Sequence, residues 1–359
     1  MARNRFFGLT NRVLMLMAAA LLVLSYLSML VNPAKLWLMS LAGLMFVPFA
    51  LLNFFLLIWA FVRRSKAFVI PLLALIPAFF FLGRYARFVS EEETAPVVSG
   101  DVVKVMSWNV GRFAMSSRFM DFENFEQCAD SVFNYIKEQD ADIICLQEVR
   151  LGDSRRIRQY LDMKMPGYSF EYYIFPGRGS SFGNLTISRM PVKNRGVIRF
   201  DESANLAIFS DYRVGDRTFR VYNCHFESYN ISFSGIVRAL LRNDSEVFVR
   251  TGEKMRRSIT RRPKQVNKVF SDIEDCPVEA FVCGDFNDNP TSYTYYRMMR
   301  DRKDTFVEAG NGFGATYSRM WPLLRIDYIL CPESTTVIDH RTPHVRLSDH
   351  YPVISEIAL

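Results

Sequence analysis

The chain has 359 residues, of which half are hydrophobic, with a mean hydropathy of +0.04 and a formal net charge of +7. This length is sufficient for more than one domain, and this hydropathy is high for a wholly soluble protein. The charge is concentrated near the N-terminus. Residues 1–99 contain nine Lys or Arg and three Asp or Glu, which leaves 35 basic and 34 acidic residues in the rest of the chain. The near-neutral remainder argues against dedicated binding to a long polyanion.

Three charge-free runs dominate the N-terminal region, over residues 13–34, 36–62 and 67–83. A helix of about 20 apolar residues crosses a bilayer, and about 17 is near the lower limit. We therefore expect residues 1–83 to form a membrane anchor of three transmembrane helices, in contact with the membrane through residues 13–83. A cleaved signal peptide is the alternative for the first run alone, although this run is longer than a typical signal-peptide core.

The basic residues that flank these runs predict an orientation. Arg3, Arg5 and Arg12 precede the first run, and Arg63, Arg64 and Lys66 separate the second from the third, whereas Lys35 alone separates the first two. The positive-inside rule places the N-terminus in the cytoplasm, so that three crossings put the C-terminal domain on the extracytoplasmic side. Arg84 and Arg87, after the third run, oppose this orientation. If the third run is re-entrant, the domain faces the cytoplasm instead.

Residues 84–100 are polar and turn-rich, which indicates a linker, and short β-rich runs then alternate with amphipathic stretches. We expect strands over residues 102–107, 142–146, 280–283, 325–330 and 352–357, a meander of strands between 170 and 224, and helices over 122–138 and 263–273, the second beginning at Pro263. This alternation predicts a layered α/β domain over residues 101–359. All six cysteines lie in this domain, and we expect buried thiols rather than a disulfide framework or a zinc site.

Polar side chains stand at or just beyond the ends of the apolar runs. Taken singly, each has an ordinary explanation as a turn former, a helix cap or a solvated residue. Together they make six polar strand ends in one domain, namely Ser107-Trp108-Asn109, Gln147-Glu148, His225 with Glu227 and Ser228, Gly284-Asp285-Phe286-Asn287-Asp288, Arg325-Ile326-Asp327 and Ser348-Asp349-His350. Because binding and catalytic groups are often found on such loops, we expect these side chains to converge on one site.

These motifs, in this order, resemble those of the endonuclease/exonuclease/phosphatase (DNase I-like) family. The motifs that carry the resemblance are Trp108-Asn109-Val110, Leu146-Gln147-Glu148, Gly284-Asp285-Phe286-Asn287, Arg325-Ile326-Asp327-Tyr328 and Ser348-Asp349-His350, and the similarity covers residues 101–359. It implies a four-layer α/β (α+β) sandwich, with two packed β-sheets flanked by helices. It also implies the activity of a Mg²⁺-dependent phosphoester hydrolase, for which Mn²⁺ is a possible substitute.

The resemblance further implies a role for each motif residue. The catalytic residues would be Asp285, His350, His225, Asn287 and Asp327. Among them, Asp285 orients or deprotonates the attacking water, and Asp327 fixes the tautomer of His350. The substrate phosphate would be bound by Asn109, His225, Asn287 and His350. The metal would be held by Glu148 with Asn109 and Asp349, since a hard cation prefers oxygen ligands.

Two details refine the comparison. The segment Cys224-His225-Phe226-Glu227-Ser228 resembles the histidine motif of the sphingomyelinase and tyrosyl-DNA phosphodiesterase branches. Gly111 stands where abasic-site endonucleases carry an aspartate, which favours a single metal ion. His340 and His344 match no motif, and we expect structural roles for both.

These features predict a membrane-anchored, metal-dependent phosphoester hydrolase, in particular a phosphodiesterase acting on a membrane-proximal or extracytoplasmic substrate such as a lipid headgroup. An anchored nuclease acting on DNA or RNA is one alternative, and its signature would be a continuous basic groove. A catalytically silent, membrane-held binding module is another, but the complete set of motif residues opposes it. The sequence indicates no obligate protein partner. It does not separate lipid, nucleotide and nucleic-acid substrates, or monoesters from diesters.

Overall fold

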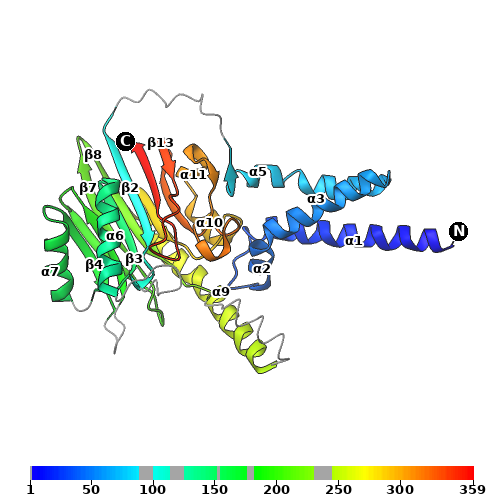
Figure 1. Ribbon diagram of the computed structural model, residues 1–359, viewed down its shortest axis with the longest axis horizontal. Helices are drawn as coiled ribbons and strands as arrows, with labels where there is room; N and C mark the ends of the chain where they lie inside the picture. Colours follow the sequence, from blue (N-terminus) through cyan, green and yellow to red (C-terminus); the bar gives the residue numbers. More distant parts are fainter. Residues whose placement is uncertain (1, 89–99, 114–124, 152–153, 176–181, 230–244) are drawn as a thin grey trace. The chain divides into compact units, whose positions relative to one another are not determined.

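The computed structural model describes residues 2–88, 100–113, 125–151, 154–175, 182–229 and 245–359 (Figure 1). These residues form two compact units. The helical unit contains residues 1–85, 229–263 and 288–296, and the sheet unit contains residues 86–228, 264–287 and 297–359. Residues 89–99 of the expected linker lie outside the described residues, and the expected domain boundaries stay predictions.

The sheet unit contains two six-stranded mixed β-sheets, as the family resemblance predicts. The first has the order β13 (Thr336–Arg341), β14 (Val353–Ala358), β2 (Val102–Asn109), β3 (Ile143–Val149), β5 (Gly183–Ser188) and β4 (Ser169–Ile174). The second has the order β10 (Arg302–Asp304), β12 (Asp327–Pro332), β9 (Glu279–Asp285), β8 (Arg217–His225), β7 (Leu206–Val214) and β6 (Asn194–Arg199). One central pair in each sheet is parallel, β2 with β3 and β8 with β9, and the other pairs are antiparallel.

Apolar residues alternate along the central strands, so that both faces of each strand are buried. On β2, Val103 and Val105 belong to the core between the two sheets, whereas Met106 and Trp108 belong to a second core beneath the outer helices. The inter-sheet core also contains Cys145, Cys283 and Cys331, and all six cysteines of the chain are free.

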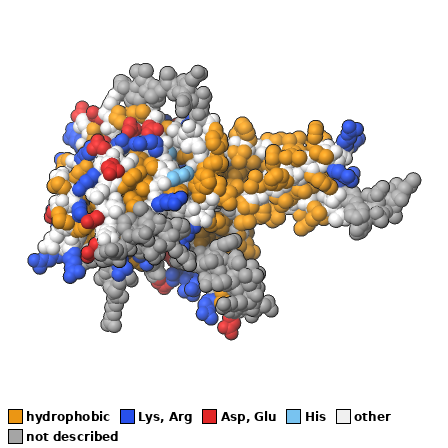
Figure 2. Space-filling view, in the orientation of Figure 1, with side chains coloured by type: hydrophobic (Ala, Val, Ile, Leu, Met, Phe, Trp, Pro, Cys, Tyr) orange, Lys and Arg blue, Asp and Glu red, His pale blue; other side chains and the backbone are white. Residues whose placement is uncertain are grey.

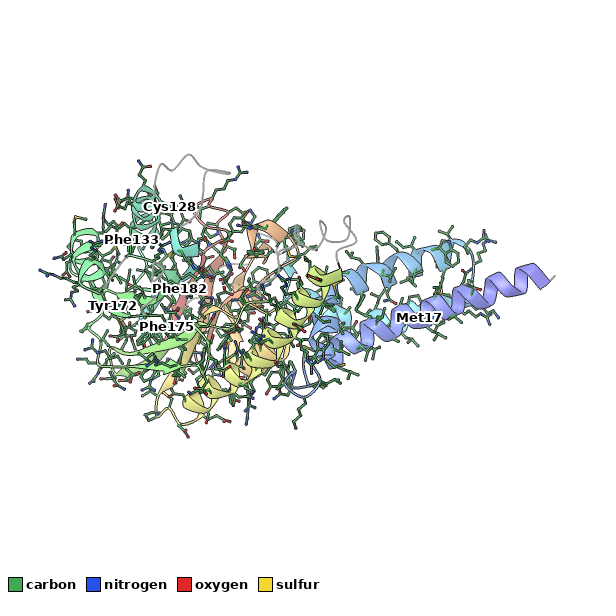
Figure 3. The ribbon with its side chains drawn as sticks, turned by 90° about the horizontal axis from the view of Figure 1, so that it is seen from below. Met17, Cys128, Phe133, Tyr172, Phe175 and Phe182 are labelled. Atoms are coloured by element: carbon green, nitrogen blue, oxygen red, sulfur yellow. The ribbon has the colours of Figure 1, made fainter. Side chains whose placement is uncertain are left out.

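Helices cover the outer faces of the sheets and complete the four-layer sandwich (Figure 1). On the first sheet lie α6 (Phe125–Gln139) and α7 (Ser154–Lys164); Cys128 and Phe133 of α6 join the outer core, and Tyr172 packs against it (Figure 3). On the second sheet lies the C-terminal part of α9 (Ser245–Glu274), where the Tyr222 hydroxyl donates to Asp272 at 2.7 Å. The shorter elements are η2 (Gly111–Phe113), α10 (Tyr293–Met298), α11 (Thr305–Ala309), η3 (Ser318–Met320) and a two-stranded sheet of β1 (Ala86–Arg87) with β11 (Gly312–Phe313).

The second expected helix is longer than its sequence pattern indicates. The pattern predicts a helix over residues 263–273 with Pro263 at its first position, but α9 begins at Ser245 and Pro263 lies inside it. A proline inside a helix removes one backbone hydrogen bond, a cost that tertiary packing can offset. Val266 and Phe270, which lie on one face of α9, are buried, and Asp272 on the same helix bonds to Tyr222 of the second sheet, so this part of α9 has such packing.

The helical unit begins with α1 (Ala2–Leu27), α2 (Leu38–Leu44) and α3 (Phe46–Val62), followed by η1 (Lys66–Phe68), α4 (Val69–Leu75) and α5 (Ala78–Leu82). Within the described residues, one helix is long and apolar enough to cross a membrane, through its segment Thr10–Leu27. The pair α2 and α3 would make a second span, but it is bent by 60°, and the third apolar run consists of shorter helices over Lys66–Leu82. Of the three transmembrane helices expected from the sequence, the described residues therefore show one continuous candidate, not three.

Prolines account for both breaks. Pro48 is the third residue of α3, where a missing N–H is tolerated, but its ring prevents a continuous helix from reaching back into α2. Pro77 has no N–H with which to extend α4 and stands as the N-cap of α5. Hydropathy alone identifies the apolar runs and does not show these interruptions.

Within the helical unit, α1 and α3 run antiparallel. The rings of Tyr26 and Phe46 are 5.9 Å apart near one end, and midway along the pair Asn53 Nδ2 donates to the carbonyl of Ala18 at 2.9 Å. Apolar side chains cover the exposed surface of these helices (Figure 2), and Met17, which projects from α1 in Figure 3, is 58% exposed. A continuous apolar surface of this kind marks contact with lipid or with another protein.

Candidate active site

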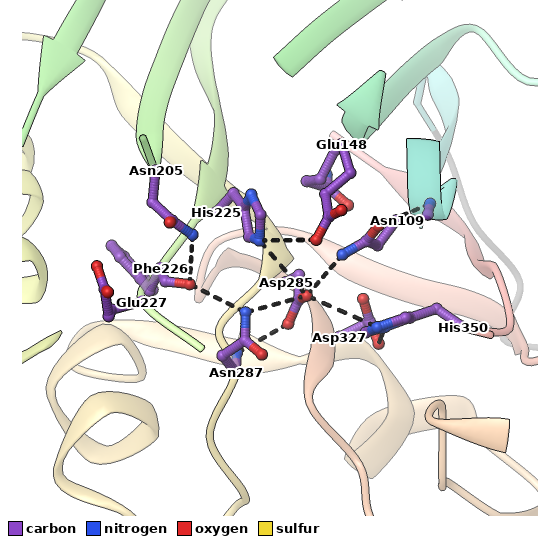
Figure 4. Close-up of polar contacts among 12 residues, drawn as sticks. Asn109, Glu148, Asn205, His225, Phe226, Glu227, Asp285, Asn287, Asp327 and His350 are labelled. Atoms are coloured by element: carbon purple, nitrogen blue, oxygen red, sulfur yellow. Dashed lines mark hydrogen bonds and ion pairs between the residues drawn. The ribbon is translucent and has the colours of Figure 1, made fainter. Parts of the chain in front are cut away.

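The predicted site residues converge at one end of the sandwich, where strands of both sheets end (Figure 4). Asn109 is the last residue of β2, and Glu148 lies near the end of the neighbouring parallel strand β3. In the second sheet, Asp285 at the end of β9 lies opposite His225 of β8 and opposite Asp327 of β12. Two parallel strand pairs, packed face to face, thus deliver polar strand ends from distant parts of the sequence to one place.

Asp285 lies at the centre of the site. Its Oδ2 accepts hydrogen bonds from Nδ2 of Asn109 at 2.8 Å and from Nδ2 of Asn287 at 3.2 Å, and its Oδ1 accepts from the Asn287 backbone N–H at 2.8 Å. Burial, together with the nearby Asp327 carboxylate, raises the pKa of Asp285 well above its ordinary value. The raised pKa makes this carboxylate a stronger base than an exposed aspartate, and the three N–H groups fix its orientation.

Two imidazoles flank the Asp285 carboxylate (Figure 4). Nε2 of His225 and Nε2 of His350 each lie 3.9 Å from Oδ2 of Asp285. That separation is too long for a direct hydrogen bond, and a third group or a water molecule fits such a gap. Nε2 of His225 is also 3.7 Å from Oε1 of Glu148. The arrangement is suited to the oxygens of a tetrahedral phosphoryl group.

The two histidines differ in protonation. Nδ1 of His350 lies 2.9 Å from Oδ2 of Asp327. Burial alone would lower the pKa of His350, but the carboxylates of Asp327 and Asp285 outweigh it and raise the pKa to about 10. Burial lowers the pKa of His225, against the opposing effect of Glu148. At neutral pH the site therefore contains one imidazolium and one neutral imidazole.

The backbone of Glu148 directs its side chain into the site. Its φ of 53° lies in the left-handed region that non-glycine residues seldom adopt, and the register of β3 against β5 shifts between Leu146 and Val149. Oε2 of Glu148 pairs with Nε of Arg112 at 2.9 Å. Burial would raise the pKa of Glu148, but the neighbouring His225 and Arg112 lower it below its ordinary value. The group is therefore a carboxylate at neutral pH.

Two places in the site have the donor chemistry for a divalent cation, namely the cluster of Asp285, Asp327 and His350 and the carboxylate of Glu148. The ligand atoms of Asp285, Asp327 and His350 lie within 4.8 Å of one another. In that group, however, Nδ1 of His350 is already bonded to Asp327, and the Asp285 oxygens accept three N–H groups. Glu148 keeps Oε1 outside its ion pair with Arg112, and a carboxylate oxygen is the donor that Mg²⁺ prefers. The donor set therefore fits a hard cation at Glu148.

The other two predicted metal ligands, Asn109 and Asp349, have partners within the protein. Oδ1 of Asn109 accepts the Gly111 N–H at 3.0 Å, and Oδ2 of Asp349 lies 3.5 Å from Nη2 of Arg319. Gly111 has a φ of +54°, and a Cβ there would lie 3.1 Å from Oδ1 of Asp349. The backbone conformation thus explains the glycine at this position. Metal binding by Asn109 and Asp349 stays a prediction.

Two residues outside the predicted motif positions support the site. Arg112 pairs with Glu148 and lies over the ring of Phe182, which is labelled in Figure 3, at 4.1 Å. Its pairing with Glu148 depends on the left-handed turn at Arg112 and has no signal at a strand end. Tyr317 makes an edge contact with the His350 ring at 5.2 Å. It reaches the site through an isolated β-bridge to His350, a long-range pairing that has no local sequence signal.

A buried polar layer connects the two sheets beneath the site. Nε2 of Gln147 donates to Oδ1 of Asn223 at 2.8 Å, and Nδ2 of Asn184 donates to the Asn223 carbonyl at 3.0 Å. Nδ2 of Asn223 in turn donates to the carbonyl of Leu185 at 3.1 Å. Any slip between the sheets would leave buried amides unpaired, so this layer fixes the alignment of the strand ends above it.

Sequence comparison agrees with this architecture. A model of the endonuclease/exonuclease/phosphatase family matches residues 106–350. The chain belongs to this family. Members of the family are phosphoester hydrolases, and the resemblance predicted from the motifs is confirmed. A model of a domain of unknown function matches residues 4–85, and no curated protein matches the chain.

Solved structures share the fold of the sheet unit. A family member from Bacteroides vulgatus is 18% identical with a TM-score of 0.53, over 72% of this chain and 99% of its own. Humanized TDP2 of D. rerio is 17% identical with a TM-score of 0.51, over 72% and 99% of the two chains. The catalytic domain of human Nocturnin, with a bound sulfate anion, is 16% identical with a TM-score of 0.50, over 72% and 94%. At these identities the likeness concerns the fold alone.

Proposed function

We propose that this protein is a membrane-anchored, metal-dependent phosphodiesterase that cleaves an amphiphilic, membrane-proximal substrate on the extracytoplasmic side. The hydrolase assignment is carried by the two Nε2 atoms of His225 and His350, each 3.9 Å from Oδ2 of Asp285. N–H donors at these two positions can stabilise the negative charge that develops on the oxygens of a phosphoryl group. A silent binding module would have no use for a buried carboxylate with a strongly raised pKa beside them.

In this proposal, Asp285 orients a water molecule and accepts one of its protons as the water oxygen bonds to phosphorus. The bond between phosphorus and the ester oxygen breaks, and the leaving alcohol takes up a proton from solvent. The N–H groups of His225 and His350 donate to the phosphoryl oxygens as negative charge develops. Asp327 keeps the His350 ring charged and oriented. Asn287, whose Nδ2 donates to Asp285 and to the carbonyl of Phe226, positions the base.

A divalent cation completes the proposed site, and we infer Mg²⁺, with Mn²⁺ as a substitute. Glu148 would hold it through Oε1, with Asn109 and Asp349 as further candidates, while Arg112 fixes the orientation of the Glu148 carboxylate. When bound, such a cation neutralises charge on the phosphoryl oxygens. A site with few protein carboxylates is consistent with an ion that keeps several of its waters.

The helical unit supports the proposed membrane topology. At one end of the α1–α3 pair, Oγ of Ser28 donates to the carbonyl of Thr291 at 2.9 Å. Thr291 belongs to residues 288–296, which the chain joins directly to the sheet unit. Because α1 and α3 are antiparallel, the basic residues Arg12, Arg63, Arg64 and Lys66 gather at the opposite end. The positive-inside rule assigns that end to the cytoplasm and the end that carries Ser28 and Thr291 to the other side.

We accordingly propose three passes through the bilayer, formed by α1, by the bent pair α2–α3 and by the broken run Lys66–Leu82. The third run returns along the first, because the hydroxyl of Tyr26 in α1 donates to the carbonyl of Ala74 at 2.8 Å. Lys35, Arg84 and Arg87 follow the ends of the first and third passes and are fewer than the basic residues at the cytoplasmic end. The exposed apolar surface of these helices is then the surface that contacts lipid.

An exposed aromatic surface favours an amphiphilic substrate. It consists of Phe88, Phe313 and Trp321, which are 73%, 42% and 45% exposed, and its neighbouring rings are 5.6 and 5.7 Å apart. Trp321 follows η3, whose preceding residue Tyr317 contacts the His350 ring. Aromatic side chains of this kind favour the membrane–water interface. Trp321 of the aromatic surface is thus four positions along the chain from Tyr317, the residue that contacts His350.

The test is turnover by the full-length protein in detergent micelles. The substrates are sphingolipid and phospholipid diesters, single- and double-stranded DNA, RNA and soluble phosphomonoesters, each with Mg²⁺ and with chelator. We expect Mg²⁺-dependent cleavage of a lipid diester that His350→Ala and Asp285→Asn abolish. Cleavage of nucleic acid alone would replace the lipid assignment with the nuclease. No cleavage by folded protein would overturn the hydrolase proposal.

A further inference from the structure

The residues that follow the catalytic loop are held by the helical unit. Asp288 is bonded directly to Asn287, and residues 288–296 belong to the compact unit of the N-terminal helices. The polar side chains of Asn289, Thr291 and Thr294 in this segment are no more than 2% exposed. Buried polar groups require hydrogen-bond partners. Thr294 donates to Asp288 within the segment, whereas Asn289 and Thr291 bond to the N-terminal helices that the sequence predicts as a membrane anchor.

The carbonyl of Gly43 is the main partner. It accepts hydrogen bonds from Nδ2 of Asn289 at 2.9 Å and from Oγ1 of Thr291 at 3.0 Å. Gly43 lies in the last turn of α2, next to the 60° bend that separates α2 from α3. This carbonyl also accepts a backbone N–H at the C-cap of α2, and a carbonyl oxygen has two lone pairs. The end of α2 therefore provides the acceptor that holds this segment.

The fit at Gly43 excludes any side chain. A Cβ at this position would lie 2.3 Å from Oγ of Ser28 and 2.7 Å from the carbonyl oxygen of Thr291. The Ser28 hydroxyl donates to that same carbonyl, and the Tyr85 hydroxyl lies 2.7 Å from Oγ1 of Thr291. Three separate parts of the N-terminal region, after α1, in α2 and after α5, therefore meet at one threonine.

Asp288 is fixed independently, at the junction with the catalytic loop. Its Oδ1 accepts from the Tyr229 hydroxyl at 2.9 Å, and its Oδ2 accepts from the Thr294 hydroxyl at 2.8 Å and pairs with Nη1 of Arg262 at 3.0 Å. Asp288 and Arg262 are both buried. A buried ion pair with these added hydrogen bonds defines one position for its members, because losing one partner leaves an uncompensated charge.

We infer that Ser28, Gly43 and Tyr85, acting through Thr291, position the loop that carries Asp285 and Asn287. The N-terminal helices are then a positioning element of the active site as well as an anchor. The catalytic readout of this inference rests on the proposed hydrolase activity, whereas its structural readout does not.

Two matched pairs of variants test the inference in the full-length protein in detergent micelles. Gly43→Ala places a methyl group against Thr291, whereas Gly252→Ala adds the same group on α9 where nothing lies within 4 Å. Thr291→Val removes the hydroxyl that bonds to Gly43. Thr260→Val removes a hydroxyl that donates to its own helix, at the carbonyls of Arg256 and Arg257.

The readouts are kcat and KM for a soluble diester, hydrogen–deuterium exchange of peptides covering residues 283–292, and the unfolding temperature. We expect Gly43→Ala and Thr291→Val to lower kcat by about tenfold or more, with KM changed less than about twofold, because the base is misplaced rather than lost. Exchange at residues 283–292 should become faster in both, and Thr291→Ser should restore the wild-type values. Gly252→Ala and Thr260→Val should change neither kcat nor the exchange at residues 283–292.

If Gly43→Ala does not fold, Thr291→Val carries the test. A folded Thr291→Val with unchanged kcat, or with unchanged exchange at residues 283–292, would overturn the inference. If the wild-type protein turns over no substrate but exchange becomes faster in Thr291→Val alone of the threonine pair, the proposed activity fails while the structural role of the N-terminal helices is supported.

Discussion

Nδ1 of His350 lies 2.9 Å from Oδ2 of Asp327. This contact joins the loop before β14, which carries His350, to the first residue of β12, which is Asp327. Oδ1 of the same Asp327 carboxylate is buried and has no hydrogen-bond partner among the described residues. With few other donors to share its charge, the carboxylate acts mainly on the imidazole ring. The pair behaves as one unit, in which the charge of His350 depends on Asp327.

We predict that Asp327→Asn lowers kcat by at least about 100-fold. Asparagine has nearly the same volume, but it carries no charge to hold His350 as an imidazolium and does not fix which ring nitrogen bears the proton. Steady-state kinetics on a soluble diester measure the effect. The matched control is Asp216→Asn, which removes an exposed carboxylate paired with Arg213 at 3.3 Å and should leave kcat unchanged. A kcat within about tenfold of wild type would show that the reaction does not depend on a positively charged His350.

Glu148 supplies the second prediction, which concerns the metal. Chelation should abolish activity, and added Mg²⁺ should restore it. Glu148→Gln removes the negative charge but keeps the shape, so the Mg²⁺ concentration for half-maximal activity should rise roughly tenfold or more. Glu356→Gln, which removes a carboxylate paired with Lys104 at 3.0 Å, is the control. Equal Mg²⁺ dependence in wild type and Glu148→Gln would move the cation to Asp285, Asp327 and His350.

The site was predictable from the sequence to the extent that it is built from strand ends. Asn109, Asp285 and Asp327 each stand where an apolar alternation stops, and the sheet registers then bring them together. Arg112 and Tyr317 could not be found in this way. They reach the site through a left-handed turn and a single β-bridge, which depend on the folded backbone rather than on a local pattern.

The helices show the same division. The apolar runs were visible in the sequence. Their breaks at Pro48 and Pro77 were not, because hydropathy does not register a proline that interrupts the backbone hydrogen bonds of a helix. At Pro263 the sequence predicts the start of a helix, but α9 continues through this residue. Tertiary packing of α9 offsets the hydrogen bond that a proline inside a helix loses. The contact between Gly43 and Thr291 joins residues that no local pattern relates.

The aromatic surface leads to a third prediction. Trp321→Ala should reduce turnover of a lipid diester in vesicles several-fold while leaving turnover of a soluble diester near the wild-type value, because the side chain contacts the interface rather than the phosphate. Met163→Ala, at an exposed apolar residue on α7, is the control. The measurement is the ratio of the two rates in each variant. If the ratio is unchanged in Trp321→Ala, this surface does not serve a membrane substrate.

His340 provides a prediction on stability, away from the active site. Its Nδ1 lies 2.8 Å from Oγ1 of Thr305, whose hydroxyl donates to the carbonyl of Ile329, so the ring nitrogen must be the donor. Nδ1 of the ring therefore carries a proton. Burial lowers the pKa of His340 to about 3, and the positive charge of Arg325 adds to this effect.

In the unfolded chain a histidine titrates near a pH of about 6.5. Because the folded-state pKa is depressed, the contribution of His340 is fully present above that pH and is lost as the pH falls from about 6.5 toward about 3. The loss is about 1.4 kcal/mol per pH unit, or about 2 kcal/mol by pH 5. We predict that His340→Gln lowers stability at pH 7 but shows a smaller further decrease in unfolding temperature between pH 7 and pH 5 than wild type. His344→Gln, where the ring stacks on Tyr351 at 4.5 Å, is the control and should keep the wild-type decrease. An equal decrease in wild type and His340→Gln would mean that the acid sensitivity of the fold arises from other groups, such as His225 and the carboxylates, because a neutral glutamine takes up no proton in this range.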